Sequence, residues 1–431
     1  MLPGFVRDRA FLRSRGATRS AGQFLTLAHS LAATLPDRPA ALNLCERRDN
    51  FLVAFVAMLI RGQVCLLPPS RVPAVVNEVM AEHPGSYVLD DAFVEHVRPD
   101  QRPPSLALPA IPSDRVVVLG YTSGSTGRPR PNPKTWGCFA ACTALNSSRL
   151  RAASTALGEE SLPWIVATVP PQHMYGMELS VLLPLLGGMG IHGGRPLYPA
   201  DIASALADVP SPRILVSTPV HLRALLESGV DLPEISAVVS ATAPLPAELA
   251  SAIEWRFGTV LLEYFGSTET CIVASRRTAV DDAWNPYPQV RLQPAEDGTQ
   301  VDAPWFTAAV TLQDVLEIRA DGTFTVRGRN ADMVEVAGKR ASLADLTRRL
   351  ASIPGVADAV VFQTDDADST AVRRLAALAV ADGMTAAAVL EKLAEAVDPA
   401  FLPRPLVLVP RLPRNEVGKL PREQLLAALK R

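Results

Sequence analysis

Short apolar runs, rich in β-branched residues, alternate with longer amphipathic stretches through the middle of the chain. The short runs predict strands and the amphipathic stretches predict helices. Because the runs are apolar throughout and helices separate them, the pattern predicts a mostly parallel sheet with helices on both faces. The expected strands are 116–120, 164–169, 213–217, 237–240 and 260–264, and the expected helices are 134–150, 178–186, 219–227 and 246–257.

Related patterns flank this central stretch. The residues before it predict helices at 21–35 and 50–61 and strands at 64–67 and 87–89. The residues after it predict a polar loop at 293–304 and a hairpin over 312–328 that turns at Asp321-Gly322. An α+β pattern then follows, with strands at 359–362, 371–380 and 406–409 and helices at 343–350 and 386–396. We therefore predict a large N-terminal α/β domain, residues 1–329, and a small C-terminal α+β domain, residues 330–431.

Composition narrows the class of protein. The chain is 48% hydrophobic with a net charge of −2, so its electrostatics favour neither a nucleic acid nor a membrane surface as partner. The most apolar run, 51–60, has half of the roughly 20 residues that a membrane span needs, and the first 20 residues lack the apolar core of a signal peptide. We expect a cytoplasmic protein with no membrane span.

The cysteines support a reducing compartment. An odd number of five, without a spacing framework, argues against a secreted disulfide protein. Cys138 and Cys142 would share a helix face, but two thiols alone do not make a zinc site. We therefore expect buried thiols at all five positions, which are Cys45, Cys65, Cys138, Cys142 and Cys271.

A tract of glycines and hydroxyl residues, 121–127, follows the strand at 116–120. Glycine lets the backbone approach a ligand closely, and a run of N–H and hydroxyl groups suits an anion such as a phosphate chain. The tract lacks the Gly-Lys-Ser/Thr of the common nucleotide-triphosphatase loop. Asn132 and Pro133 are expected to cap and begin the next helix. The alternative interpretation is a flexible turn.

A second candidate site follows the strand at 260–264. There a glycine, a hydroxyl residue and a carboxylate come in order as Gly266, Thr268 and Glu269. A carboxylate that faces a phosphate needs a cation between them, and Mg²⁺ commonly bridges carboxylate and phosphate oxygens. The alternative is a surface turn in which Glu269 caps a helix.

The glycine tract, Tyr-Thr-Ser-Gly-Ser-Thr-Gly-x-Pro, resembles the phosphate loop of the adenylate-forming superfamily of acyl-CoA and aryl-CoA synthetases and adenylation domains. Further blocks resemble that family in the family's order: 170–176, 240–245, 263–270, 328–332 and 412–422. The resemblance implies ATP-dependent activation of a carboxylic acid. The carboxylate oxygen attacks the α-phosphate to give an acyl-adenylate and pyrophosphate, and a thiol then displaces AMP.

The resemblance also implies roles for individual residues. The catalytic residues would be His173 in the acyl pocket, Thr268 at the α-phosphate and Lys419 in the C-terminal tail. Glu269 and Thr126 would hold Mg²⁺, and the block at 328–332 would be a hinge that makes the small domain a mobile lid. The residues expected to bind ATP are Thr122, Ser123, Gly124, Ser125, Thr126, Gly127, Arg130, Thr242, Ala243, Pro244, Tyr264, Phe265, Gly266, Ser267, Asp314, Arg329 and Arg340.

Several positions depart from the family pattern. Arg130 stands where the family usually has a lysine, and Phe265 stands where a tyrosine is commoner. Ala331 replaces an aspartate or lysine, and Leu312-Gln313 replaces the Thr-Gly that usually precedes Asp314. These departures keep a second hypothesis open, that the chain is a non-catalytic nucleotide-binding relative. Retention of Glu269 and Lys419 favours an enzyme.

The sequence gives less direct evidence on which carboxylic acid is the substrate. No aspartate stands out as the partner of a substrate ammonium group, which disfavours amino acids. The tract 66–71, the loop Pro-Gln-His-Met-Tyr-Gly and the compact size are similar to ligases of aryl-polyene pigment pathways of the xanthomonadin type. That similarity implies a hydroxybenzoate-like acid as substrate and the phosphopantetheine thiol of an acyl carrier protein as acceptor. Free coenzyme A is the alternative acceptor.

Overall fold

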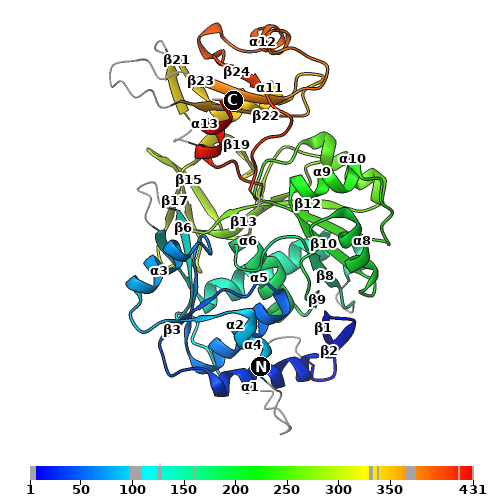
Figure 1. Ribbon diagram of the computed structural model, residues 1–431, viewed down its shortest axis with the longest axis vertical. Coiled ribbons are helices and arrows are strands. Elements are labelled where there is room, and N and C mark those ends of the chain that lie inside the picture. Colours follow the sequence, from blue (N-terminus) through cyan, green and yellow to red (C-terminus); the bar gives the residue numbers. More distant parts are fainter. Residues whose placement is uncertain are drawn as a thin grey trace. The chain divides into compact units, whose positions relative to one another are not determined.

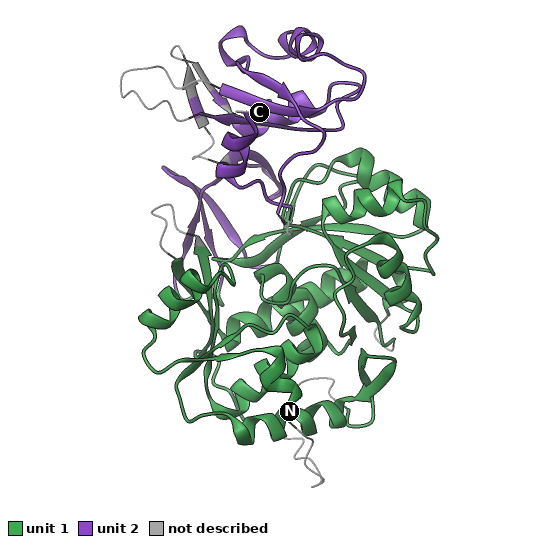
Figure 2. Cartoon of the chain, in the orientation of Figure 1, with its two compact units in different colours: residues 1–288, 304–307 green, residues 289–303, 308–431 purple. Residues whose placement is uncertain are grey.

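The computed structural model describes residues 6–97, 109–123, 129–158, 161–329, 333–336, 339–364, 375–415 and 418–429. The chain forms two compact units, shown in separate colours in Figure 2. Unit 1 comprises residues 1–288 and 304–307, and unit 2 comprises residues 289–303 and 308–431. This division identifies compact parts of the chain and does not locate a hinge. The domain boundary expected after residue 329 therefore stays a prediction.

The larger sheet of unit 1 has nine strands in the order β14-β13-β12-β11-β10-β8-β9-β1-β2. The strands from β12 to β1 run parallel, which confirms the sheet type expected from the apolar runs. Two expected strands, 213–217 and 237–240, have the bounds that the sequence predicts. The strands are β1 (Ala10–Ser14), β2 (Ala17–Ser20), β8 (Trp164–Ala167), β9 (Gly190–His192), β10 (Arg213–Ser217), β11 (Ala237–Ser240), β12 (Leu261–Ser267), β13 (Cys271–Arg276) and β14 (Asn285–Pro286).

Helices cover both faces of this sheet (Figure 1). One face packs against α8 (Pro199–Ala207), α9 (Pro219–Glu227) and α10 (Ala247–Phe257) through a buried apolar cluster. The other face carries α5 (Trp136–Ala153), α6 (Met174–Met177), the π-helical turn η2 (Glu178–Leu182) and α7 (Leu183–Gly187). A short 3-10 helix, η1 (Thr155–Leu157), follows α5.

A second sheet of unit 1 has five strands in the order β5-β3-β4-β6-β7. These are β3 (Ala40–Asn43), β4 (Val64–Leu67), β5 (Tyr87–Leu89), β6 (Val116–Ser123) and β7 (Pro129–Thr135). The helices before β6 are α1 (Ala21–Thr34), α2 (Arg48–Arg61), α3 (Pro73–Glu82) and α4 (Asp91–Glu95). α2 is buried over nearly its whole length, which explains its apolar run as a core helix. No helix in the described ranges is long and apolar enough to cross a bilayer.

The segment after the glycine tract corrects one expectation. Asn132 and Pro133 do not begin a helix, because they lie in β7, which pairs antiparallel with β6. Prolines at 129, 131 and 133 face the same edge of the strand, since alternate residues of a strand point the same way. That edge is the outer one, where no ladder hydrogen bond is lost. The helix begins later, and Thr135 caps it by accepting a hydrogen bond from Cys138 N at 3.2 Å.

The described residues of unit 2 form four small sheets. β15 (Arg291–Ala295), β16 (Gly298–Asp302) and β17 (Val310–Leu312) form one sheet, so the polar loop expected at 293–304 was wrong. Most of β15 is exposed and therefore lacks the apolar alternation that marks a strand. The hairpin expected over 312–328 is confirmed by β18 (Asp314–Ile318) and β19 (Phe324–Arg329).

The rest of unit 2 has its own core. The strands β22 (Asp358–Gln363), β23 (Leu375–Val380) and β24 (Leu406–Leu408) form a sheet whose two faces carry separate apolar clusters. α11 (Leu343–Ala351), α12 (Ala386–Ala394) and α13 (Arg422–Leu429) pack on it, and the first two helices were expected. The remaining elements are β20 (Met333–Val336), β21 (Lys339–Ser342) and the 3-10 helix η4 (Pro399–Phe401).

Candidate active site

The parallel strands of the large sheet end at the same level. In neighbouring strands Ala167 is paired with Val216, Ser217 with Ser240, and Ser240 with Glu263. The loops that follow β8, β11 and β12 therefore leave one edge of the sheet. Ligands of open α/β sheets bind at this carboxyl edge. The loop with His173, the loop with Thr242 and the turn with Glu269 are thus brought together.

Tyr175 fastens the loop of residues 170–176 over this edge. Its hydroxyl lies 3.0 Å from the carbonyl oxygen of Ser217 and 3.1 Å from that of Val239, and burial raises its pKa. Gly176 permits the close turn, because a β-carbon there would lie 2.0 Å from the carbonyl oxygen of Pro170. His173 directly precedes α6, so the loop presents it at the start of a helix that the sheet holds in place.

Gly120 joins two of these loops to the glycine tract. A β-carbon at Gly120 would lie 2.9 Å from Met174 Cε and 3.2 Å from Thr268 Cγ2. The backbone of β6 therefore contacts both the histidine loop and the Thr-Glu turn just before the glycine tract begins. Residues 124–127 of that tract lie outside the described residues, as does the side chain of Ser123. Thr122 lies at the mouth of the tract, and its hydroxyl accepts a hydrogen bond from Asn132 at 3.3 Å.

The Thr-Glu turn is held by its own backbone and hydroxyl groups. Ser267 Oγ accepts hydrogen bonds from the N–H groups of Glu269 at 3.1 Å and Thr270 at 3.2 Å. Gly266 is required at the bulge, because a β-carbon there would lie 2.2 Å from the carbonyl oxygen of Cys271. The side chains of Thr268 and Glu269 remain partly exposed, so both are accessible to a ligand.

Lys134 is a charged residue of this site that the sequence did not single out. It lies on β7, only 4% exposed, and its ammonium donates a hydrogen bond to the carbonyl oxygen of Glu269. Arg130, which was expected to supply the positive charge near the phosphates, is exposed on the same strand. The sequence contained a signal for Lys134. Arg130, Asn132 and Lys134 alternate with prolines, so in a strand all three side chains would point to the same face.

The loop expected to bind adenine is anchored by Glu263 of β12. Its buried carboxylate accepts hydrogen bonds from Leu245 N at 3.3 Å, Arg276 Nε at 2.7 Å and Thr278 Oγ1 at 2.6 Å. Burial raises the pKa of Glu263, and the guanidinium of Arg276 opposes that rise. Within the loop Thr242 has a left-handed backbone, with φ of +79°, which is unusual for a β-branched residue. Ala243 and Pro244 follow it at the surface.

Tyr264 and Phe265 point to opposite faces of β12, as neighbours in a strand do. The Tyr264 side chain is 3% exposed, and its hydroxyl donates to the carbonyl oxygen of Asn146 in α5 at 3.3 Å. The Phe265 ring lies 5.4 Å from the Trp284 ring and is partly exposed. The adenine contact expected of both residues stays a prediction, and for Tyr264 the backbone rather than the phenol is available for it.

The other candidate residues lie in unit 2. Asp314 and Arg329 are register partners across the β18–β19 hairpin, so two expected ribose and phosphate ligands are neighbours. Arg340 is the register partner of Glu335. The hinge residues 330–332 lie outside the described residues, and the side chains of Arg329 and Arg340 are also not described.

Lys419 lies in an exposed, closed loop. Its N–H donates to Asn415 Oδ1 at 2.9 Å, and its carbonyl oxygen accepts from Asn415 N at 2.8 Å. Arg414 anchors the loop to β22 by donating two hydrogen bonds to Asp358, at 2.8 and 3.0 Å. The lysine is therefore presented to solvent from a braced loop.

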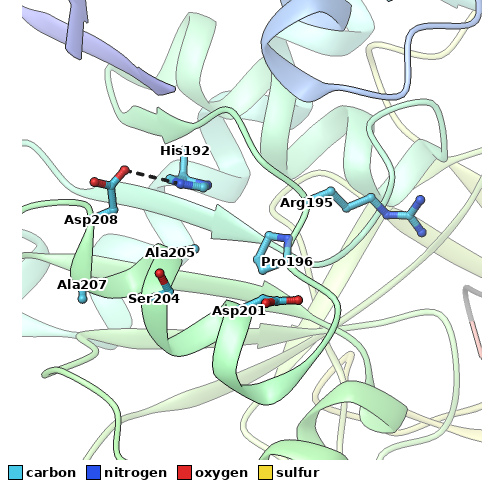
Figure 3. Close-up of a pocket in the computed structure, with 8 residues that line it drawn as sticks. All are labelled: His192, Arg195, Pro196, Asp201, Ser204, Ala205, Ala207 and Asp208. Carbon is cyan, nitrogen blue, oxygen red and sulfur yellow. Dashed lines mark ion pairs between the residues drawn. The ribbon is translucent and has the colours of Figure 1, made fainter. Parts of the chain in front are cut away.

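A polar pocket of about 580 Å³ opens elsewhere in unit 1 (Figure 3). Among its lining residues, Asp208 lies 3.6 Å from His192 Nε2, and it also accepts two hydrogen bonds from Arg13 outside the pocket. Arg195 points away from this pair, as Figure 3 shows, and donates to the carbonyl oxygen of Thr168 at 3.3 Å. None of the residues predicted from the sequence lines this pocket.

A family model described as AMP-binding enzyme matches residues 64–303, which include most strands of the two sheets of unit 1, the loops with His173 and Thr242, and the Thr-Glu turn. The chain belongs to the AMP-binding enzyme family. It is 31% identical over 312 residues to a 4-coumarate–CoA ligase of Halorhodospira halophila, covering 69% of this chain and 73% of that protein. It is 24% identical over 394 residues to a fatty acid–[acyl-carrier-protein] ligase of Mycobacterium marinum, covering 74% of this chain and 69% of that protein.

The fold agrees with this family. The o-succinylbenzoate CoA synthetase of Bacillus subtilis, solved with its acyl-adenylate intermediate, superposes with a TM-score of 0.81 over 97% of this chain and 95% of that one, at 18% identity. The α/β architecture with a smaller C-terminal α+β part is therefore confirmed. As a member of the AMP-binding enzyme family, the chain is an acid–thiol ligase that works through an acyl-adenylate. The hypothesis of a non-catalytic relative is not favoured.

Proposed function

We propose that this AMP-binding enzyme uses ATP and Mg²⁺ to adenylate an aromatic carboxylic acid of the hydroxybenzoate class. The acyl group then passes to the phosphopantetheine thiol of an acyl carrier protein. The observation that carries the proposal is the meeting of β6, the histidine loop and the Thr-Glu turn at Gly120. This junction joins the expected phosphate, acyl and metal sites within one small region.

The described residues fit a magnesium–nucleotide complex. The turn offers the Glu269 carboxylate and the Thr268 hydroxyl from one braced segment, and the β6–β7 hairpin offers Thr122 beside it. Glu269, with Thr126 of the glycine tract, would hold Mg²⁺. When bound, Mg²⁺ neutralises phosphate charge during attack on the α-phosphate. Thr268 would orient that phosphate, and His173 would shape the acyl pocket and orient the attacking carboxylate.

Positive charge is the main requirement of the reaction, because a carboxylate and a triphosphate repel each other. Arg130 and Lys419 are exposed cations that would contact phosphate oxygens directly. Lys134 would act indirectly, because it would fix the main chain of Glu269 and not contact the phosphates itself. Asp314 and Arg329 would bind the ribose and phosphates, with residues 330–332 as the hinge of a lid that brings Lys419 into place.

The preference for an aromatic acid has two supports. One is the sequence similarity to 4-coumarate–CoA ligases. The other is the resemblance of tracts 66–71 and 170–176 to aryl-polyene ligases. These tracts are in contact: with its amide oxygen facing the guanidinium, Gln172 accepts from Arg71 Nε and Nη2, both at 3.2 Å. Arg71 also donates to the carbonyl oxygen of Cys45 at 2.7 Å, so it ties the histidine loop to the second sheet.

Acid-dependent exchange of pyrophosphate into ATP tests the first half of the proposal. A panel of hydroxybenzoates, cinnamates and fatty acids should give the fastest exchange with a hydroxybenzoate. Faster exchange with a fatty acid would contradict the substrate class. The acceptor is tested separately, by comparing the mass gain of a phosphopantetheinylated carrier protein with the yield of aryl-CoA. Faster aryl-CoA formation at matched thiol concentration would identify free coenzyme A as the acceptor.

A further inference from the structure

Three cysteines far apart in the sequence meet beneath the Thr-Glu turn. Cys138 and Cys142 are one helical turn apart on α5, and Cys271 is the first residue of β13. Their sulfur atoms all lie within 4.8 Å of one another, and each side chain is buried. The helix supplies two of the thiols on one face, and the sheet supplies the third. Two thiols would not make a metal site, but three converging thiols supply a coordination shell.

Two ionisable side chains lie beside these thiols, and both are compatible with a bound metal ion. The carboxyl group of Glu178 accepts from Ile272 N with both oxygens, at 3.1 Å each, so a further acidic group is held next to Cys271. The ammonium of Lys134 is fixed two residues before Cys271, on the carbonyl oxygen of Glu269. Three thiolates and a divalent ion carry one net negative charge, which this buried ammonium offsets.

We propose that Cys138, Cys142 and Cys271 form a binding site for one soft divalent metal ion of the Zn²⁺ or Cd²⁺ type, coordinated by three thiolates. Thiolate ligands select soft ions over Mg²⁺ and Ca²⁺, so the site would not compete with Glu269 for the catalytic ion. Each coordinating thiol releases its proton to solvent when the ion enters.

The distances suit this ion class. A Zn–S bond of about 2.3 Å in tetrahedral geometry places two sulfurs about 3.8 Å apart, and the longer bonds of Cd²⁺ place them farther apart. Sulfurs within 4.8 Å of one another can close on such an ion by side-chain rotation and small shifts. Cys271 has a left-handed backbone, with φ of +59°, at the end of the Thr-Glu turn. In this conformation its sulfur lies near those of Cys138 and Cys142.

Cadmium loading provides the test. The reduced, chelator-treated chain is incubated with Cd²⁺ for a prolonged period, because buried thiols are reached through local opening, and free ion is then removed. We expect one Cd²⁺ per chain by elemental analysis, a thiolate-to-metal charge-transfer band in the ultraviolet, and three sulfur neighbours by X-ray absorption. A chain that retains no Cd²⁺, or a bound ion with oxygen and nitrogen neighbours, would overturn the proposal.

Matched cysteine variants assign the site. Cys45 and Cys65 are also buried thiols but lie outside the cluster, so the double variant Cys45→Ser, Cys65→Ser should keep the ion and the band. Cys142→Ala and Cys138→Ser should each lose the band and the stoichiometric ion. Thermal unfolding of each metal-free variant shows whether it is folded, and Cd²⁺ should raise the melting temperature of the wild type and not that of the cluster variants. Unchanged binding in both folded cluster variants would reject these ligands.

Discussion

The ammonium of Lys134 is hydrogen-bonded to the main-chain carbonyl of Glu269, 135 positions along the chain. The bond ties β7, which continues from the glycine tract, to the turn that offers the expected magnesium ligand. A lysine buried to this degree is uncommon, and its position is fixed by the strand on one side and the turn on the other. Lys134 is therefore interpreted as a positioning residue for the Thr-Glu turn.

Substitution of Lys134 tests this interpretation. Lys134→Met keeps the length of the side chain but leaves the Glu269 carbonyl without its donor, which costs about 1–3 kcal/mol of stability. A small displacement of the turn should lower kcat for pyrophosphate exchange about 10- to 100-fold. Lys134→Arg should retain more activity than Lys134→Met. Wild-type exchange by a folded Lys134→Met variant would show that the turn needs no support from β7.

Lys419 should act in one half-reaction. In Lys419→Ala the acid-dependent pyrophosphate exchange should fall about 10²- to 10³-fold, because a cation at the reacting phosphate is lost. Thiolysis of a supplied acyl-adenylate should remain largely intact. Lys392→Ala is the matched control, since Lys392 is another exposed lysine of unit 2, on α12. Equal loss of both half-reactions in Lys419→Ala would contradict the assigned role.

Glu178 should make stability depend on pH. Burial raises its pKa well above the usual value for a glutamate. As pH rises, the unfolded chain therefore loses this proton first, and between the two pKa values the native state holds a proton that the unfolded state lacks. The free energy of unfolding consequently falls as pH rises through this window.

Glu178→Gln removes that titration while keeping an oxygen acceptor for Ile272 N. Its free energy of unfolding, from urea titrations between about pH 5 and about pH 8, should depend less on pH, by on the order of 1 kcal/mol. Glu248→Gln, on the exposed surface of α10, should leave the slope unchanged. If the wild type and Glu178→Gln have the same slope, Glu178 does not titrate in this range.

Thr242 should cost stability through its backbone. A left-handed conformation is unfavourable for a β-branched residue by about 1–3 kcal/mol, and glycine adopts it freely at a smaller entropic cost. Thr242→Gly should therefore raise the free energy of unfolding by about 1 kcal/mol. Thr242→Ala removes the hydroxyl but retains the β-carbon, so it should gain less. Equal stabilities of the glycine and alanine variants, by urea unfolding, would exclude backbone strain as the cause.

Elements whose apolar runs are flanked by clear turn residues were predictable from the sequence. β10, β11 and α9 have the expected bounds because their apolar residues are buried and turn residues flank them. The loops with His173 and Thr242 follow strands as expected, but β6 and β12 each continue three residues beyond their expected ends, into the glycine tract and the Thr-Glu turn. The Tyr175 contact with β10 and β11 was not readable, because it depends on the register between strands.

The missed features have physical causes. β7 was taken for a helix start because Asn132 and Pro133 suit an N-cap and a first helical position, although prolines at every second position suit an edge strand. Lys134 was overlooked because that error removed the strand on which its orientation depends. Cys271 converges with Cys138 and Cys142 although it lies 129 positions after Cys142 in the chain, and spacing in the sequence carries no trace of such a contact.

The prolines of β7 also bear on solubility. A bare sheet edge is a template on which a second chain can add its own strand, and such pairing leads to aggregation. Pro129, Pro131 and Pro133 offer no amide hydrogen along that margin, so an incoming strand would find acceptors there without the matching donors. The hairpin that carries the glycine tract is thereby protected from pairing with a neighbouring molecule.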